Sequence, residues 1–346
     1  MHPILFSESI SQDLAQCLSS IPHSQLFVIC DENSQKYCLP KVQSLISNEA
    51  SIFVASPGES NKTLATCEKI WTKMTEAHLD RKALVINIGG GVITDMGGFC
   101  SSIYKRGIRF INIPTTLLSQ VDASVGGKLG VDFNGLKNHL GVFNEPEAVI
   151  IADEFLGTLP LQELRSGFAE IMKHGLIHDA AYFKSLNLQD WENSDWRKLI
   201  KHSVEIKKNV VLQDPKEAGL RKILNFGHTI GHAVETFYLD SSQHLLHGEA
   251  IAIGMICEGF LSSQMNGMPE RDLKLIVDSF IHVYGKVTLP DQDLESIVDL
   301  CLQDKKNEGS TLLFSLLSEI GKCEYNIPVI RTQIVQALNF YQNLPH

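Results

Sequence analysis

The chain has 346 residues, of which 44% are hydrophobic and 20% charged, and its formal net charge is −10. This length suffices for about two domains with a sizeable core, and the composition excludes a disordered or fibrous chain. The acidic balance argues against a general binder of nucleic acid or of anionic membranes, although a local group of lysines can still bind an anionic substrate.

The eight cysteines are scattered among apolar neighbours and form no CxxC pair, which predicts reduced core thiols. The N-terminal segment lacks the basic start and apolar stretch of a signal peptide. No apolar run reaches the ~18 residues of a membrane span. We therefore expect a soluble, cytoplasmic protein.

The N-terminal half carries short apolar runs that predict strands. These runs are Gln25–Cys30, Ser51–Ala55, Ala83–Ile88, Arg109–Ile113 and Ala148–Ala152. A helix is expected over Tyr37–Ser47. Strands about 25–35 residues apart with helical patterns between them are typical of β-α-β units, so we expect an open α/β domain with a parallel sheet over residues 1–155.

After Pro160 the apolar residues recur at intervals of three and four, which predicts a mostly helical second domain over 156–346 with a hinge at Asp153–Pro160. Only Thr311–Ser315 and Cys323–Ile327 suit strands. The expected helices are Leu161–Leu176, Trp196–Gln213, Leu220–Tyr238, Gly248–Met265, Arg271–Tyr284, Asp293–Cys301 and Thr332–Gln342.

A glycine-rich segment, GGGVITDMGGF, follows the third predicted strand at Gly89–Phe99. Glycines at a strand-to-helix turn let a phosphate approach the helix N-terminus, so a dinucleotide loop is favoured over a plain structural turn. Asp31 and Asn33 follow the first strand, where an acid can bond a ribose hydroxyl or simply cap a helix. Glu59 and Lys62 follow the second strand and, taken alone, suit a solvated turn.

Histidines and one glutamate suggest a metal site in the second half. His228 and His232 are four residues apart on a predicted helix and share a face, His247 begins the next helix, and Glu170 lies on an earlier one. A glutamate with two or three histidines from different helices can hold a divalent metal with an open position. The spacing alone leaves open which histidines bind, and a pair of ordinary surface or core histidines is the alternative.

Basic residues also gather in short motifs. Gly127-Lys128 and Lys137-Asn138 lie in an apolar, glycine-rich loop, SVGGKLGVDFNGLKNHLG, with few acids. Lysines in such a setting suggest an anionic, phosphate-bearing small molecule as substrate, although each alone suits a solvated charge. The others are Lys105-Arg106, Lys173, Lys207-Lys208, Arg221 and Lys305-Lys306.

These motifs resemble the 3-dehydroquinate synthases of the sugar phosphate cyclase family from about Asp31 to Lys306. The segments that carry the resemblance are GGGVITDMGGF, PTTLLSQVDASVGGKLGVD, LKNHLGVF, FAEIMKHGLI, GLRKILNFGHTIGHAVE and LHGEA. The resemblance implies a Rossmann-like N-terminal domain, a helical metal-binding C-terminal domain and a homodimer. It also implies NAD and a divalent metal, usually Zn²⁺ or Co²⁺.

The resemblance also implies roles for individual residues. The metal ligands would be Glu170, His228 and His247. NAD would contact Asp31, Asn33, Glu59, Lys62, Gly91, Val92, Ile93, Thr94, Asp95, Thr115, Thr116, Lys128, Lys137, Phe155 and Thr158, with Thr94 standing where the family often has glycine. The substrate pocket would use Asp122, Lys128, Asn138, Lys173, Lys207, Arg221, Asn225, His232 and one of Lys305 and Lys306, with Arg106 reaching the substrate phosphate across the dimer.

The implied reaction converts 3-deoxy-D-arabino-heptulosonate 7-phosphate to 3-dehydroquinate and phosphate in the shikimate pathway of aromatic amino acid biosynthesis. NAD is regenerated in each turnover, so the net reaction is that of a lyase. Three alternatives remain: a sister cyclase for an amino-substituted or other heptulose phosphate, an NAD- and metal-dependent polyol dehydrogenase, and an inactive scaffold. A dehydrogenase would need no phosphate-binding cations, so the basic residues argue against it. An inactive scaffold would need no intact set of metal ligands, so the presence of that set argues against a scaffold.

Overall fold

The computed structural model describes residues 3–46, 50–239, 241, 243–303 and 311–345. The chain divides into two compact units, Met1–Pro160 and Leu161–His346. Within the described ranges, no helix combines the length and the apolar character that a membrane span requires. The first unit is an α/β domain and the second is mostly helical, as the sequence predicts.

The first unit is built on a six-stranded, fully parallel sheet. Five of its strands are those predicted, whereas β1 was not predicted because three residues give too short an apolar run. The spatial order is β1 (Ile4–Phe6), β8 (Ala148–Ile151), β5 (Arg109–Pro114), β4 (Leu84–Gly89), β2 (Leu26–Asp31) and β3 (Ser51–Ala55).

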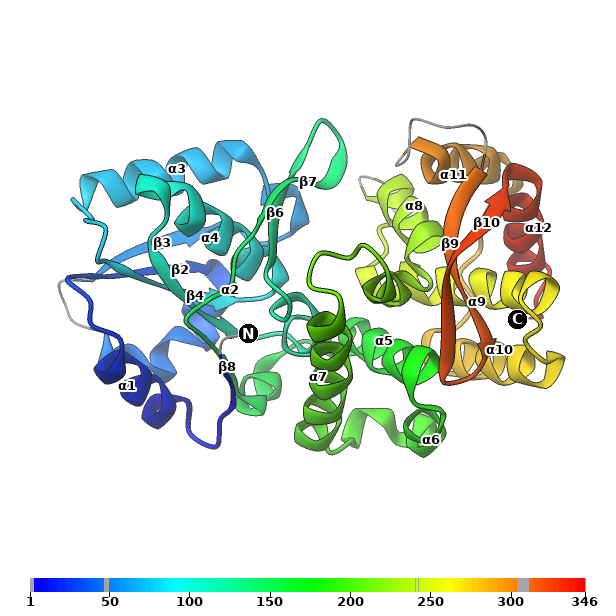
Figure 1. Cartoon of the computed structure of the whole chain (residues 1–346), viewed down its shortest axis with the longest axis horizontal. Coiled ribbons are helices and arrows are strands. Elements are labelled where there is room, and N and C mark those ends of the chain that lie inside the picture. The colour runs from blue at the N-terminus through cyan, green and yellow to red at the C-terminus, as the bar shows by residue number, and fades with distance from the viewer. Residues whose placement is uncertain (1–2, 47–49, 240, 242, 304–310, 346) are drawn as a thin grey trace. The chain divides into compact units, whose positions relative to one another are not determined.

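Apolar side chains alternate between the two faces of this sheet. In β2, Phe27 and Ile29 pack with α3 (Leu64–Glu76) and α4 (Gly91–Ile103). Val28 and Cys30 pack on the opposite face with α1 (Ile10–Ser20) and the segment 38–46. Figure 1 shows α3 and α4 on the same side of the strands and α1 on the other. Both faces are therefore covered, which explains the almost continuous hydrophobic runs of these strands.

The direction in which the strands are added reverses between β2 and β4. The chain passes from β2 outward to β3, returns to β4 on the other side of β2, and continues to β5 and β8. In open α/β sheets, ligands bind outside the carboxyl ends of the strands at such a reversal. Asp31 ends β2 and the glycine-rich segment follows β4, so the fold places both at this edge.

Two local predictions in this unit are wrong. The expected loop around Lys128 and Lys137 is a hairpin of β6 (Lys128–Phe133) and β7 (Leu136–Phe143), joined by Asn134-Gly135. Both turn residues have positive φ, 52° and 77°, the conformation that makes Asn-Gly a strong hairpin signal. The helix expected over Tyr37–Ser47 is instead α2 (Glu32–Tyr37) followed by two 3-10 turns, the first of which contains Pro40.

The second unit surrounds a buried central helix, α9 (His247–Met265), which packs against α5, α8, α10 and α12. Its strands form one antiparallel hairpin and are longer than expected. The other elements are α5 (Leu161–His178), α6 (Ala180–Ser185), α7 (Trp196–Gln213), α8 (His228–Tyr238), α10 (Glu270–Tyr284), α11 (Asp291–Gln303), α12 (Arg331–Gln342), β9 (Thr311–Glu319) and β10 (Lys322–Ile330) (Figure 1).

One predicted helix of this unit is broken in two. Residues Leu220–Asn225 form a 3-10 turn, and α8 begins only at His228. Gly227 has a φ of 81°, a left-handed conformation that a continuous helix cannot contain. The break places His228 at the first position of α8.

All eight cysteines are free, and seven of them are buried. Burial, followed by the neighbouring charge of Asp31, raises the pKa of Cys30 to about 12, so its thiol stays protonated and unreactive. The prediction of free core thiols is confirmed for seven cysteines, whereas Cys323 is half-buried.

Candidate functional site

The structure brings the three predicted metal ligands together from three helices of the second unit. Glu170 lies in α5 and is fully buried, His228 begins α8 and His247 begins α9. The Nε2 atoms of His228 and His247 lie 3.4 and 3.3 Å from the same oxygen, Oε1 of Glu170. Potential ligand atoms of these residues all lie within 4.8 Å of one another.

Two glycines of α9 allow this convergence. A Cβ added to Gly248 would lie 2.2 Å from the carbonyl oxygen of Ser166 in α5, and one added to Gly254 would lie 1.9 Å from that of Gly227. The backbone N–H of Gly248 also donates to Oγ of Ser166 at 2.9 Å. The start of α9 can therefore approach α5 and the start of α8 only because these positions carry no side chain.

The protonation states of Glu170 and His228 suit a metal ligand set. Burial opposes the charged form of Glu170, but Lys173 and His228 outweigh it and hold the pKa of the carboxyl well below its usual range. Burial and Lys173 lower the pKa of His228. Nδ1 of His228 donates to the carbonyl of Phe226 at 3.1 Å, which leaves the Nε2 lone pair facing Glu170.

One carboxylate oxygen and two imidazole nitrogens are the donors that Zn²⁺ and similar divalent ions take in catalytic sites, where three protein ligands leave a position for substrate. The residues present therefore fit a divalent metal. In the group that includes Glu170, the histidine from α8 is His228.

His232 and His244 lie differently from the two proposed ligands. The ring of His232, one turn along α8, is centred 5.0 Å from that of His228 and 5.9 Å from that of His247. Together with Glu235 and His247, His232 forms a second group whose potential ligand atoms lie within 4.8 Å. His244 is exposed, lies in the segment before α9 and donates Nδ1 to the carbonyl of Leu239 at 2.9 Å.

Sequence reasoning missed two buried acids beside these ligands. Glu235 lies 3.4 Å from Nδ1 of His247, and its position seven residues after His228 could have signalled that both share one helix face. Glu258, on α9, accepts the backbone N–H groups of Gly227 at 2.6 Å and Ile230 at 3.1 Å. Its signal was an acid in the middle of a mostly apolar stretch of α9, because a buried acid must find a partner.

Three predicted substrate cations of this unit are buried. Lys173, Lys207 and Arg221 expose 1%, 6% and 2% of their surface. They lie on α5, α7 and the turn Leu220–Asn225, and each of these elements packs against the other two. Lys173 pairs with Glu170, and Arg221 donates Nη1 to the carbonyl of Pro215 at 2.7 Å.

Asn225 and one of Lys305 and Lys306 are the other substrate residues predicted in this unit besides His232. The side-chain amide of Asn225 donates to Oε1 of Glu217 at 2.7 Å. Lys305 and Lys306 lie outside the described residues.

In the first unit, five predicted residues form one polar cluster around the buried ammonium of Lys62. This group donates to Oδ2 of Asp95 at 2.7 Å and to Oδ1 of Asn138 at 2.6 Å. Oε1 of Glu59 lies 4.0 Å from it and 3.9 Å from Nζ of Lys137. Burial opposes the charge of Lys62, but Asp95 and Glu59 outweigh it and raise the pKa of the ammonium. Glu59 and Lys62 thus belong to a partly buried network of charged and polar side chains rather than to a solvated turn.

The glycine-rich turn is closely packed where α4 begins. A Cβ added to Gly90 would lie 3.1 Å from Thr116, and one added to Gly91 would lie 3.2 Å from Ala123. Thr94 is buried, and its hydroxyl donates to the carbonyl of Gly91 at 3.2 Å. The first turn of α4 therefore accommodates a threonine at this position, with its hydroxyl hydrogen-bonded to the backbone. Val92 and Ile93 complete that turn, and buried Thr115 precedes Thr116 after β5.

The remaining predicted residues of the first unit occupy varied settings. Oδ1 of Asp31 accepts the backbone N–H of Ser34 at 2.7 Å, so Asp31 caps α2, the alternative left open by the sequence. Thr158 donates its hydroxyl to the carbonyl of buried Phe155 at 3.3 Å. Asn33, Arg106 and Lys128 are exposed, and Asp122 is half-buried.

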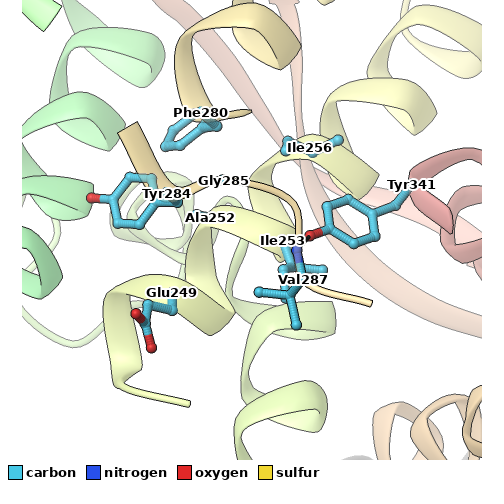
Figure 2. Close-up of a pocket in the computed structure, with 9 residues that line it drawn as sticks. All are labelled: Glu249, Ala252, Ile253, Ile256, Phe280, Tyr284, Gly285, Val287 and Tyr341. Atoms are coloured by element: carbon cyan, nitrogen blue, oxygen red, sulfur yellow. Dashed lines mark hydrogen bonds between the residues drawn. The ribbon is translucent and has the colours of Figure 1, made fainter. Parts of the chain in front are cut away.

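A separate pocket lies between α9, α10 and α12 of the second unit (Figure 2). Its lining is apolar apart from Glu249 and two tyrosines, and it includes none of the predicted site residues. Its polar groups serve the fold: the hydroxyl of Tyr284 donates to the carbonyl of Arg165 at 2.8 Å, and that of Tyr341 accepts the N–H of Val287 at 2.9 Å. Figure 2 shows the Tyr284 hydroxyl pointing away from the other lining residues.

Comparison with known proteins identifies the family. Residues 52–166 match the family model described as 3-dehydroquinate synthase N-terminal, and residues 167–307 match its C-terminal counterpart. A 3-dehydroquinate synthase of Parabacteroides distasonis is 39% identical over 343 residues, which cover 98% of this chain and 97% of that protein. The chain belongs to the 3-dehydroquinate synthase family.

Solved structures of two cyclases share the fold of this family member. One is a 2-deoxy-scyllo-inosose synthase complexed with carbaglucose-6-phosphate, NAD⁺ and Co²⁺, with a TM-score of 0.85, 25% identity, and coverage of 97% of this chain and 96% of that one. The other is the 2-epi-5-epi-valiolone synthase ValA of Streptomyces hygroscopicus with NAD⁺ and Zn²⁺ bound, with a TM-score of 0.86, 25% identity, and coverage of 99% and 96%.

Proposed function

We propose that this protein is a 3-dehydroquinate synthase, which converts 3-deoxy-D-arabino-heptulosonate 7-phosphate to 3-dehydroquinate and phosphate in the shikimate pathway. The convergence of Glu170, His228 and His247 carries the proposal, because the fold has assembled this donor set from three helices. The match to 3-dehydroquinate synthases along nearly the whole chain supports it. The first unit would bind NAD and the second the metal.

We assign the metal to Glu170, His228 and His247. A divalent ion there, Zn²⁺ or Co²⁺ as in the related cyclases, would lower the pKa of a bound substrate hydroxyl. Lys173 pairs with Glu170 and keeps it ionised, which preserves its capacity to bind a cation. His232 follows one turn after the ligand His228 and is assigned to the substrate.

We assign NAD to the carboxyl edge of the parallel sheet. NAD bound there would supply reversible hydride transfer to the reaction. The backbone N–H groups at the start of α4 suit the pyrophosphate, since helix N-termini attract anions. The cluster of Glu59, Lys62 and Asp95 would stand beside it. The other assigned residues are Asp31, Asn33, Gly91, Val92, Ile93, Thr94, Thr115, Thr116, Lys128, Lys137, Phe155 and Thr158.

The substrate carries a phosphate and a carboxylate, and the buried cations suit both. Arg221 offers a planar pair of donors, whereas Lys173 and Lys207 act as compact charges. Charged hydrogen bonds in a buried setting are stronger than those at a solvated surface. Asn225 and His232 of the second unit and Asp122, Lys128 and Asn138 of the first complete the proposed substrate set.

We further propose a homodimer, in which Arg106 serves the substrate phosphate bound by the partner subunit. Arg106 is exposed and ends the 3-10 turn Tyr104–Arg106 with a φ of 69°. Light scattering should give twice the chain mass of 38.5 kDa. A monomer at working concentrations would contradict this assignment.

The competing functions fit less well. A sister cyclase would be expected to match its own class best, yet the two cyclase structures are 25% identical and the 3-dehydroquinate synthase is 39% identical. A polyol dehydrogenase has no use for three buried cations.

Phosphate release tests the proposed function. The purified holoenzyme should release phosphate from 3-deoxy-D-arabino-heptulosonate 7-phosphate and form an equal amount of 3-dehydroquinate. A chelator should abolish both, and added Zn²⁺ or Co²⁺ should restore them, because the ligand set is the centre of the site. Removal of NAD should abolish them as well. Release from a heptulose phosphate but not from the heptulosonate would instead establish a sister cyclase.

A further inference from the structure

His247 lies between two carboxylates, one on each side of its ring. Nε2 is 3.3 Å from Oε1 of Glu170, and Nδ1 is 3.4 Å from Oε2 of Glu235. Glu235 exposes 6% of its surface, so this carboxylate is withdrawn from solvent and directed at the imidazole. The proposed function gives a role to Glu170 but none to Glu235.

The ring can bind a metal through only one of these nitrogens in a given orientation. If Nε2 is the ligand atom, Nδ1 carries the proton and needs a hydrogen-bond acceptor. His228 has the same arrangement, because its Nδ1 donates to the carbonyl of Phe226 and its Nε2 faces Glu170. Histidines that bind metals nearly always donate their second N–H to a carboxylate, a carbonyl or water.

The position of Glu235 along the chain ties the two histidines together. Glu235 lies on α8, seven residues after the ligand His228 and on the same helix face. The start of α9, which carries His247, packs closely against α5 at Gly248, and α9 crosses the beginning of α8 at Gly254. One helix thus supplies a proposed ligand and the acceptor for another ligand on its neighbour.

We propose that Glu235 is a positioning residue that accepts the Nδ1–H of His247 and thereby directs Nε2 of His247 to the metal. The inference rests on the proposed metal set Glu170, His228 and His247. The competing arrangement is a metal held by His232, Glu235 and His247, whose potential ligand atoms also lie within 4.8 Å of one another. In that arrangement Glu170 would not be a ligand, although the Nε2 atoms of both His228 and His247 face its carboxylate.

Metal affinity tests the proposal without relying on turnover. Dissociation constants for Zn²⁺ and Co²⁺ are measured by chelator competition on the wild-type protein, Glu235→Gln and Glu235→Ala, and visible spectra are recorded for the Co²⁺ forms. Loss of a carboxylate behind a metal-bound histidine typically weakens metal binding about 10–100-fold, which we expect for Glu235→Ala. Glu235→Gln keeps one acceptor oxygen and should lie between Glu235→Ala and wild type. Both variants should bind one equivalent of Co²⁺ with a shifted spectrum.

The matched control is Asp293→Asn. Asp293 lies on α11, and its carboxylate accepts a hydrogen bond at 2.9 Å from the hydroxyl of Tyr238, which lies on α8 like Glu235. Away from the metal set, this change should alter the dissociation constant by no more than about twofold. Thermal unfolding of the metal-free proteins shows whether a variant is still folded. Weaker metal binding by a folded variant can then be attributed to the orientation of His247. If Glu235→Ala does not fold, the isosteric Glu235→Gln decides alone.

Two results would overturn the inference. Wild-type affinity and spectrum in folded Glu235→Gln, while His247→Ala loses the metal, would show that Glu235 does not orient His247 and would leave the metal site intact. Loss of the metal equivalent in Glu235→Ala but not in Glu170→Gln would make Glu235 a ligand and replace the proposed set. A wild-type protein that binds no metal would refute the proposed function itself.

Discussion

At the scale of single residues, the position of the cations is the most informative feature. The chain has a net charge of −10, yet Lys173, Lys207 and Arg221 are each at least nine-tenths buried in the second unit. Burying a charge is expensive unless another charge or a hydrogen bond compensates it. Placing three cations on mutually packed elements therefore suits a site for an anionic substrate better than a solvated surface.

Substitution of these cations should lower kcat/KM without loss of metal or NAD. Each charged hydrogen bond to substrate is worth about 1.5–3 kcal/mol, so Lys207→Ala and Arg221→Ala should each lose about 10–150-fold. Arg221→Lys should also be impaired, because lysine lacks the planar pair of donors.

Lys208→Ala changes the exposed neighbour of Lys207 and provides the control, with kcat/KM expected near that of wild type. Steady-state kinetics on variants with verified metal and NAD content make the comparison. Losses in kcat/KM below about threefold in Lys207→Ala, Arg221→Ala and Arg221→Lys, well under the range for a charged hydrogen bond, would contradict the role of these cations.

At the scale of elements, the start of α8 depends on one carboxylate of α9. Both oxygens of Glu258 are used, since Oε2 accepts the N–H of Gly227 and Oε1 accepts that of Ile230. Helix N-termini carry unsatisfied donors and a partial positive charge, so a buried carboxylate there is stabilising. Because His228 begins this helix, Glu258 also fixes where this proposed ligand lies.

Glu258→Gln should destabilise the protein, because the amide group replaces one accepting oxygen with a donor. One buried N–H then loses its partner, at about 1–3 kcal/mol in the free energy of unfolding. Urea denaturation of the metal-free protein measures the change. Glu205→Gln, on the exposed side of α7, is the control and should stay within about 0.5 kcal/mol of wild type. Equal stability of the two variants would show that Glu258 does not cap α8.

Elements with a strong apolar pattern were the easiest to predict from the sequence. Ser51–Ala55 and Trp196–Gln213 are found with the predicted bounds. A short apolar run predicts the strand, and an apolar face that recurs every three or four residues predicts the helix. The hairpin of β6 and β7 was missed because its glycines and asparagines suggested a loop, although Asn134-Gly135 was the signal. The helix break at Gly227 depends on close packing against α9, which no local pattern shows.

At the scale of the whole molecule, the two units carry different chemistry. Unit Met1–Pro160 contains the predicted NAD residues, most of them in segments that follow the strands of the parallel sheet and two, Lys128 and Lys137, in the hairpin of β6 and β7. Unit Leu161–His346 contains the predicted metal ligands. Histidine spacing alone could not distinguish His228 from His232. The structure favours His228, because its Nδ1 is engaged by the carbonyl of Phe226 and its Nε2 faces Glu170.

The fate of NAD tests most directly the claim that these units perform one redox-neutral reaction. The holoenzyme is mixed with excess 3-deoxy-D-arabino-heptulosonate 7-phosphate and a small, known amount of NAD in a closed reaction, and 3-dehydroquinate, phosphate and NADH are followed together. We predict that 3-dehydroquinate and phosphate appear in equal amounts and exceed the NAD many-fold, with no net NADH. Accumulation of NADH in proportion to product, with the reaction stopping when NAD is exhausted, would contradict the account and establish a dehydrogenase.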